Sequence, residues 1–312
     1  MPGPRLHFDC FSGLAGDMFL GACLDLGLPL ELLEDAVARL GLDGVTLERR
    51  EAERGGIRGV RFRVLVDGVA LEGPDPEQTP HHAGARDPGA HRSLADIRHL
   101  LASSALDSVV RDRSLGFVSR LAEVEARIHR VPVDQVHFHE LGAVDAMVDL
   151  VGAAVAWAHF APESATCGPI NVGTGRVRTA HGMLPVPAPA TAELLRGLPI
   201  YGEGEGELLT PTGAVLLAEL VDRGNGDLPR LVLEGVGYGL GKRDPTGRPN
   251  AFRLLRGGPV VGEGEIVALE CTIDDLPGEG LGYLMERLLE SRAIDVFFTA
   301  VQMKKNRPGT LV

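Results

Sequence analysis

Aromatic side chains, positive charge and long uncharged apolar runs are all scarce in this chain. Only 4% of its 312 residues are aromatic, and its formal net charge is −12. Nucleic-acid-binding proteins usually combine a basic face with aromatic side chains that stack on bases, so we expect no nucleic-acid partner. The most apolar stretch, residues 142–160, carries Asp145 and Asp149. A membrane span would tolerate these charges poorly, so we expect no membrane partner either.

Cysteine is equally sparse. The four cysteines lie far apart and form no CxxC pair, which argues against both a disulfide framework and a thiolate zinc site. The first residues also lack the apolar core of a signal peptide. Together these absences predict a cytoplasmic protein with reduced thiols.

Glycine and proline, by contrast, are abundant. The 41 Gly and 21 Pro make up about a fifth of the chain, against roughly 12% in an average protein. Hydrophobic residues make up 44%, which is enough for a sizeable core. We therefore expect a folded protein with many glycine-shaped loops.

The periodicity of apolar residues predicts a mixed α/β chain of the α+β class, with a large N-terminal α/β domain over residues 1–258. Residues 68–92 have no periodicity and are typical of a flexible, His-containing insertion. The remaining elements that we expect are helices at 17–26, 30–40, 111–129 and 143–160, and paired strands at 45–54 and 58–66.

A second, smaller domain is expected over residues 262–312. Its pattern is a strand at 266–272, a helix at 281–293 and a parallel strand at 295–302, which is typical of a ferredoxin-like βαβ unit. The sequence stops at an apolar pair that follows a predicted turn, where a further strand would begin. We therefore expect this domain to be incomplete.

The strongest cluster of metal-binding residue types is His137, His139 and Glu140, followed by Asp145 and Asp149. Histidines at i and i+2 of an extended segment point to the same side, and aspartates at i and i+4 of a helix share a face. Nitrogen and carboxylate ligands suit Ni, Zn, Mn or Fe. The alternative is that the aspartates cap the helix or pair with arginines. We favour a site, because carboxylates on an otherwise apolar helix need a cation or hydrogen-bond donors.

Two weaker candidates stand beside this cluster. His81 and His82 in the insertion can gather a metal loosely, or are incidental histidines of a solvated linker. Asp9 and Asp17 flank a glycine-bearing turn that matches neither common phosphate-binding motif. They are candidates for binding a metal or a cationic group, although spacing alone favours a capped, tightly packed turn.

Three glycine-bearing segments carry groups that bind phosphate. The first contains Arg176, Arg178 and His181, in which the arginine forks and flexible backbone suit an anion. Hairpin turns with surface arginines are the alternative. Together with two further segments, it favours a phosphate-bearing small molecule.

The second segment, Thr210 to Gly213, opens a helix over 214–222 that we expect Thr212 to cap, and helix N-termini bind anions. The third, residues 237–244, is predicted to be a glycine loop with cationic side chains. Each is a weak signal alone.

The second domain places opposite charges at the carboxyl ends of its two parallel strands. Asp274 and Asp275 follow the first strand, and Lys304, Lys305 and Arg307 follow the other. Open α/β sheets bind ligands at such ends. The acids would hold a metal ion and the cations the phosphates of a polyphosphate. A solvated charged rim is the alternative.

Nine ordered motifs, taken together, resemble one family: the LarC nickel-insertion proteins, which mature the lactate racemase cofactor. The motifs are DCFSGLAGDMFLGA (9–22), ERGGIRGVRF (53–62), VHFHELGAVDAMVDLVGAA (136–154), GTGRVRTAHG (173–182) with the residues that follow it, LLTPTGA (208–214), GVGYGLGKRD (235–244), RPN (248–250), TIDDLPGE (272–279) and MKKNRPGTL (303–311).

The resemblance implies a cyclometallation. Family members insert Ni²⁺ into pyridinium-3,5-bisthiocarboxylic acid mononucleotide, forming two Ni–S bonds and one Ni–C bond. They split CTP into CMP and pyrophosphate with Mn²⁺ or Mg²⁺, and the product is a nickel pincer nucleotide.

The resemblance also implies roles for the candidate residues. The expected nickel ligands are His137, His139, Glu140, Asp149, His81 and His82. The expected acceptor of the pyridinium ring proton is Glu140 or Asp145. The expected substrate-binding residues are Asp9, Asp17, Arg176, Arg178, His181, Thr210 and Thr212. Those expected to bind CTP and Mn²⁺ are Asp274, Asp275, Lys304, Lys305 and Arg307.

The family's C-terminal domain continues past the strand where this sequence stops, and in some members a frameshift divides it into two products. The resemblance therefore implies a C-terminal companion product, and we also expect a homo-oligomer. Two other functions stay open at this point. One is a non-catalytic nickel-binding or storage protein, or an N-terminal fragment without CTP-dependent turnover. The other is a zinc hydrolase that uses the His/Asp cluster.

Overall fold

The computed structural model divides the chain into two compact units, Met1–Val260 and Val261–Val312. Both contain helices and strands, which confirms the α+β class. The predicted domains, 1–258 and 262–312, fall on either side of the same boundary. The structure describes residues 3–71, 93–136, 138, 144–179, 182–222, 227–245, 247–260 and 268–312.

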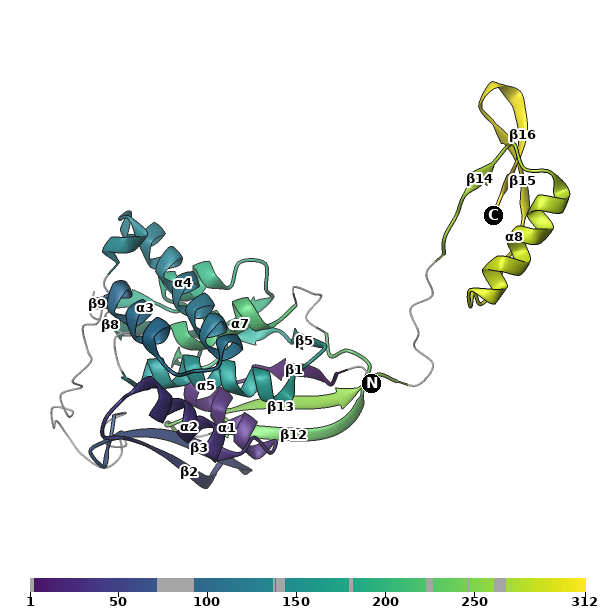
Figure 1. Cartoon of the computed structure of the whole chain (residues 1–312). Coiled ribbons are helices and arrows are strands. Elements are labelled where there is room, and N and C mark those ends of the chain that lie inside the picture. Colours follow the sequence, from purple (N-terminus) through teal and green to yellow (C-terminus); the bar gives the residue numbers. More distant parts are fainter. Residues whose placement is uncertain are drawn as a thin grey trace. The chain divides into compact units, whose positions relative to one another are not determined.

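The first unit is built on a mixed sheet (Figure 1), in which β1 pairs antiparallel with β13 and parallel with β5. The strand order is β2-β3-β12-β13-β1-β5, with β4 beside β3. The bounds are β1 (Arg5–Asp9), β2 (Val45–Arg54), β3 (Ile57–Val66), β4 (Val69–Ala70), β5 (Ser164–Cys167), β12 (Val232–Leu240) and β13 (Ala251–Gly258).

Helices cover this sheet in successive layers. Helix α1 packs on β3, β12 and β13, α5 packs on α1, and α4 packs on α5. Figure 1 shows α4 and α5 on the side of α1 that faces away from the sheet. The bounds are α1 (Gly16–Asp25), α2 (Leu30–Leu40), α3 (Leu94–Ser103), α4 (Ser108–His129), η1 (Val133–Gln135), α5 (Val144–Phe160), α6 (Pro189–Leu194) and α7 (Pro211–Leu220).

The core between α1 and the sheet is aromatic. The ring centroids of Phe8 on β1 and Phe19 on α1 are 5.5 Å apart, and Phe8 lies 5.6 Å from Phe252 on β13. Helix α5 is buried on nearly all sides, as its uniformly apolar sequence predicts. Among the described residues, no helix is long and apolar enough to cross a membrane.

Glycines in β12 let α1 approach the sheet closely. A Cβ at Gly239 would lie 1.7 Å from the carbonyl oxygen of Met18, and one at Gly237 would lie 2.1 Å from that of Ala22. The prediction of a glycine loop over 237–244 is therefore wrong for its first half. Residues Gly237 to Leu240 belong to β12, and their glycines serve helix–sheet packing.

Short strands extend the unit beyond the main sheet. Their pairings are β6 (Ile170–Asn171) with β10 (Ile200–Tyr201), β7 (Gly173–Thr174) with β11 (Gly206–Glu207), and β8 (Arg176–Thr179) with β9 (Gly182–Pro185).

The second unit is a three-stranded sheet with one helix. Strand β16 pairs antiparallel with both β14 and β15, so β14 and β15 are parallel with β16 between them. The elements are β14 (Thr272–Ile273), α8 (Gly278–Glu290), β15 (Thr299–Met303), η2 (Lys304–Asn306) and β16 (Arg307–Leu311).

Three predictions for this unit need correction. Among the described residues of the strand expected at 266–272, only the last lies in a strand, β14. The strand expected from residue 295 begins at Thr299. The predicted turn near Pro308 lies inside β16, whose register pairs Pro308 with Gln302. Proline and glycine predict turns, but β-sheet pairing with β15 determines the conformation here.

Candidate functional site

Backbone hydrogen bonds join two loops at the carboxyl end of β1. The loop from Cys10 to Ala15 follows β1, and its Leu14 accepts a hydrogen bond from the amide of Thr210 (3.1 Å) and donates one to the carbonyl of Leu208 (3.1 Å). Gly13 has φ +78°, and a Cβ there would lie 2.0 Å from the Leu208 carbonyl oxygen. Only glycine permits this close approach. The predicted glycine turn thus packs against the segment before α7.

Asn171 brings further segments to the same place. Its buried side chain donates to the carbonyl of Phe11 (3.0 Å) and accepts from the amides of Gly173 (3.1 Å) and Glu203 (3.0 Å). Local sequence patterns do not single out this residue. The sequence feature that could have identified it is a single side-chain amide between the apolar residues Ile170 and Val172.

Asp145 and Asp149 both lie on α5. Asp149 is buried and contacts the backbone at Gly16, where α1 begins; a Cβ at Gly16 would lie 2.3 Å from Asp149 Oδ2. Asp145 is half-buried in the first turn and its Oδ1 accepts a hydrogen bond from the amide of Ala146 (2.8 Å). The predicted carboxylate pair therefore lies in the first two turns of α5, and Asp145 also accepts a hydrogen bond from one amide of the first turn.

Asp9 and Asp17 already have partners within the protein. The Asp9 carboxylate accepts hydrogen bonds from Nε (2.9 Å) and Nη2 of Arg253 on β13. Partial burial lowers the pKa of Arg253, but the hydrogen bond to Asp9 and the interaction with Tyr238 outweigh burial and raise it. Asp17 accepts from the amide of Met18 (2.9 Å). Asp9 thus binds a cationic group, and that group is an arginine of the same chain.

The cap of α7 is Thr210, so the prediction that Thr212 caps this helix is wrong. Thr210 Oγ1 accepts from the amide of Gly213 (3.2 Å) and lies 2.8 Å from Thr212 Oγ1. Pro211 at the first helical position explains the earlier start, since its fixed φ suits a helix N-terminus. A Cβ at Gly213 would lie 2.1 Å from the Leu14 carbonyl oxygen, so the β1 loop packs on the first turn of α7.

Arg176 and Arg178 lie on one side of β8, and both are exposed. The hairpin of β8 and β9 begins two residues after β7, which pairs with β11. Neither arginine forms an ion pair with a described residue. The structure therefore places them on a solvated hairpin next to the loop cluster.

A pocket of about 400 Å³ lies beside these loops. Two of its lining residues are arginines, Arg243 and Arg248, and local sequence patterns do not single out the second. The only signal for Arg248 was its place in the short RPN segment. The lining residues are Glu203, Gly204, Glu205, Leu208, Arg243, Pro245, Gly247, Arg248 and Asn250.

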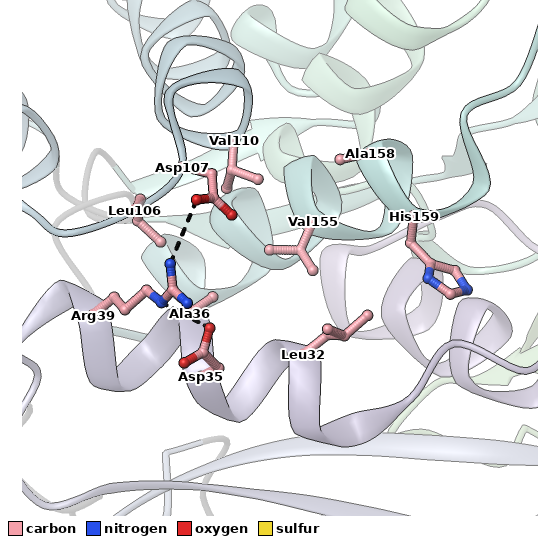
Figure 2. Close-up of a pocket in the computed structure, with 10 residues that line it drawn as sticks. All are labelled: Leu32, Asp35, Ala36, Arg39, Leu106, Asp107, Val110, Val155, Ala158 and His159. Atoms are coloured by element: carbon pink, nitrogen blue, oxygen red, sulfur yellow. Dashed lines mark hydrogen bonds and ion pairs between the residues drawn. The ribbon is translucent and has the colours of Figure 1, made fainter.

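A second, smaller pocket of about 200 Å³ lies between α2, the start of α4 and the carboxyl-terminal half of α5. Figure 2 shows Arg39 between Asp35 and Asp107, with ion-pair distances of 2.8 and 3.5 Å. Leu32 and Val155 form part of an apolar floor. The charged groups here neutralise one another, so we interpret this pocket as a packing feature of the helical layer.

In the second unit the structure brings the predicted acids and cations together. Asp274 follows β14, and its Oδ2 lies 3.7 Å from Nη1 of Arg307 at the start of β16. Lys304 and Lys305 lie in η2, directly after β15. Asp275 is the exposed neighbour of Asp274. The charged groups therefore gather at one edge of this small sheet.

Several predicted site residues lie outside the described part of the chain: His137, His139, Glu140, His81, His82 and His181. Within the part that the structure describes, no three His, Cys, Asp or Glu side chains are grouped so that they could hold a metal ion.

Two buried thiols lie side by side, that of Cys10 in the β1 loop and that of Cys167 at the end of β5. The Sγ atoms of Cys10 and Cys167 are 3.9 Å apart. Burial, followed by the hydrogen bond to Cys167, raises the pKa of Cys10 well above its ordinary value, and burial does the same for Cys23. All four cysteines are free.

Known proteins resemble nearly the whole chain. The sequence profile of the family described as nickel insertion protein matches residues 6–312. A putative nickel insertion protein of Pelobacter propionicus is 46% identical over 97% of this chain and 74% of its own length. One of Geotalea daltonii is 44% identical over 98% and 75%.

The pyridinium-3,5-bisthiocarboxylic acid mononucleotide nickel insertion protein of Desulfitobacterium hafniense is 43% identical over 98% of this chain and 73% of its own length. No solved structure matches. The match of the family profile from residue 6 to residue 312 shows that this chain belongs to the nickel insertion protein family.

Proposed function

We propose that this protein inserts Ni²⁺ into pyridinium-3,5-bisthiocarboxylic acid mononucleotide, the substrate named for the Desulfitobacterium hafniense relative. The reaction is a cyclometallation that consumes CTP with Mn²⁺ or Mg²⁺. Its product is the nickel pincer nucleotide cofactor of lactate racemase. The observation that carries the proposal is the position of Asp145 and Asp149 in the first two turns of α5, with Asp149 against Gly16 at the start of α1, in a family described as nickel insertion protein.

Nickel is a substrate here. His137, His139 and Glu140 are the proposed donors that deliver it, since imidazole nitrogen and carboxylate oxygen suit Ni²⁺. They immediately precede α5 in the sequence, so their side chains are tethered within a few residues of Asp145. Asp149 would complete the donor set from the next turn of the helix.

Formation of the Ni–C bond requires loss of a proton from the pyridinium ring. The electron pair of the C–H bond becomes the Ni–C bond, and the proton passes to a base. We assign that base to Glu140 or Asp145, because a carboxylate beside the metal accepts a proton without moving far. The half-buried position of Asp145 supports this assignment.

The charged edge of the second unit fits a metal nucleotide. Asp274 and Asp275 offer carboxylate oxygens, which hard cations such as Mn²⁺ and Mg²⁺ prefer. Lys304, Lys305 and Arg307 offer the cationic groups that bind phosphates. When bound, CTP with its metal ion supplies the free energy of phosphoanhydride cleavage.

The test incubates the purified chain with Ni²⁺, Mn²⁺, CTP and the bisthiocarboxylate mononucleotide. We expect a nickelated mononucleotide and CMP, and neither product when CTP is omitted. A variant with His137→Ala and His139→Ala should lose high-affinity nickel binding. The matched control carries His99→Ala and His129→Ala, at two exposed helical positions, and should bind nickel as the wild type does.

Two results would contradict parts of this proposal. Nickel binding without nickelated product, under all conditions, would support a nickel-binding or storage protein instead. Unchanged nickel affinity in the His137/His139 variant would remove these residues from the metal site.

A further inference from the structure

Arg243 and Arg248 belong to one loop that hydrogen bonds hold closed. The amide of Gly241 donates to the carbonyl of Asn250 (2.9 Å), and the Asn250 side chain donates back to the carbonyl of Arg243 (3.0 Å). Asn250 is buried. The loop therefore presents both arginines to the 400 Å³ pocket from a fixed base, and this volume lies in the range of small-molecule sites.

Each guanidinium packs against a glycine of residues 203–208, the other segment that lines the pocket. A Cβ at Gly204 would lie 2.1 Å from Arg248 Nη1, and one at Gly206 would lie 3.0 Å from Arg243 Nη1. Both glycines have left-handed φ values, +84° and +82°. The guanidinium groups thus occupy space that any side chain at residue 204 or 206 would restrict.

Glu203 and Glu205 line the same pocket, but the guanidinium groups donate to backbone carbonyls rather than to these carboxylates. Arg248 Nη1 donates to the carbonyl of Glu203 (2.5 Å), and Arg243 Nη2 donates to the carbonyl of Glu207. Neither forms an ion pair with a described carboxylate. The Nε of Arg248 is buried and has no hydrogen-bond partner among the described residues. A guanidinium has five N–H donors, so each arginine keeps N–H donors that no described residue accepts.

Two arginines with unused donors in one pocket match a phosphate, which accepts paired hydrogen bonds from guanidinium groups. Arg176 and Arg178, by contrast, are exposed on strand β8. A part-buried hydrogen bond also joins the arginine-bearing segment to the β1 loop, because Ser12 Oγ donates to the carbonyl of Pro249 (2.6 Å), between Arg248 and Asn250. The segment that lines the pocket is therefore anchored to the loop that contacts the start of α7.

We propose that Arg243 and Arg248 bind the 5′-phosphate of the pyridinium mononucleotide. The identity of the rest of the ligand rests on the proposed function. This assignment places the phosphate site in the pocket that Arg243 and Arg248 line, instead of at Arg176 and Arg178.

Binding of a simpler pyridinium mononucleotide tests the assignment. The probes are nicotinic acid mononucleotide and nicotinic acid riboside, which differ by the phosphate alone, titrated calorimetrically into the full chain. We expect the wild type to bind the mononucleotide more tightly, and inorganic phosphate to compete with the mononucleotide but not with the riboside. Arg243→Gln and Arg248→Gln should each weaken mononucleotide binding by about 10- to 100-fold, as for loss of a charge-assisted hydrogen bond, and leave riboside binding unchanged.

The matched controls are Arg176→Gln and Arg178→Gln, which should bind both probes as the wild type does. Equal affinity of the wild type for the two probes would overturn the assignment, as would a loss of mononucleotide binding only in the Arg176 or Arg178 variants. The competition experiment with inorganic phosphate uses only the wild-type chain, so it still tests the assignment if a substitution impairs folding.

The outcomes separate this assignment from the proposed function. Phosphate-dependent binding through Arg243 and Arg248 without nickel insertion would contradict the proposed function alone. Nickel insertion with mononucleotide affinity that is independent of both arginines would contradict the phosphate assignment alone.

Discussion

The carboxylate of Asp149 lies directly against the backbone of Gly16, at the first residue of α1. A Cβ at residue 16 would fall 2.3 Å from Oδ2 and 2.5 Å from Cγ of Asp149. The N-terminus of a helix carries unpaired amides and a partial positive charge, both of which stabilise a carboxylate. This contact explains how an acidic side chain is tolerated on an otherwise apolar, buried helix, and why glycine stands at residue 16.

Replacement of Gly16 by alanine should destabilise the first unit. The new methyl group would overlap Asp149, and such overpacking typically costs about 1–3 kcal/mol. We expect the thermal midpoint to fall by roughly 2–4 °C for each kcal/mol. The control is Gly116→Ala in α4, where a Cβ meets nothing within 4 Å; it should leave the midpoint unchanged or raise it. A Gly16→Ala midpoint equal to that of wild type would contradict the contact.

Removal of the Asn171 side chain should loosen the loop cluster. Asn171→Ala deletes three hydrogen bonds and leaves the Phe11 carbonyl and two backbone amides without their partner. We expect a loss of about 2–4 kcal/mol in the free energy of unfolding, measured with urea. Thr174→Val, which removes one exposed hydrogen bond to Gly204, should cost under about 1 kcal/mol. Equal losses for the two variants would contradict the role of Asn171.

Stability should fall in mild acid, partly because of His7. Burial lowers the pKa of His7 below its usual value, Asp9 opposes this change, and Arg253 adds to it. Below about pH 6.5 the unfolded chain takes up a proton that the folded chain resists. The stability that neutral His7 contributes is therefore present above that pH and is lost as the pH falls.

The variant His7→Gln tests this dependence. Gln can retain a hydrogen bond near Thr166, whose Oγ1 lies 2.8 Å from His7 Nδ1, but it cannot titrate. We expect the wild-type urea midpoint to drop more between pH 7.5 and pH 5.5 than that of the variant. Identical drops would show that His7 does not contribute.

Nucleotide binding by the second unit should depend on Arg307. Arg307→Gln removes the cation beside Asp274 and should weaken binding of CTP with Mn²⁺ about tenfold, as for loss of one charge-assisted hydrogen bond. The control is Arg287→Gln on α8, an arginine that pairs with Glu290 in the same unit. Equilibrium dialysis with labelled CTP measures both. If Arg287→Gln weakens CTP binding as much as Arg307→Gln does, the loss reflects the net charge of the unit, and the specific role of Arg307 is contradicted.

Local sequence patterns predicted the regular elements well. The helix at 30–40 and the strand at 45–54 have the expected bounds, because their apolar spacing and the flanking glycines at Gly41 and Gly55 act locally. The cap of α7 and strand β16 were predicted wrongly. In both cases the conformation at a proline depends on the neighbouring segment: Pro211 begins α7 beside Thr210, and Pro308 lies inside β16 beside Gly309.

The candidate site was harder to predict, because it forms from distant segments. Sequence patterns identified Asp145 and Asp149, whose charge stands out on an apolar helix. They gave no sign that Arg248 rests on Gly204, or that Asn171 joins Phe11 to Glu203, since these contacts span tens to hundreds of residues. The resemblance to known motifs indicated which residues are important. The position of each side chain could be seen only in the folded structure.

The most direct test of the account is mass spectrometry of the mononucleotide after one turnover. Nickel-loaded chain, CTP, Mn²⁺ and the bisthiocarboxylate mononucleotide are mixed at equal concentrations, and the small-molecule fraction is analysed. The account predicts a new species that has gained nickel, shows the isotope pattern of nickel and has lost the ring proton, together with an equal amount of CMP. Unchanged mononucleotide, with nickel still bound to the protein, would contradict it.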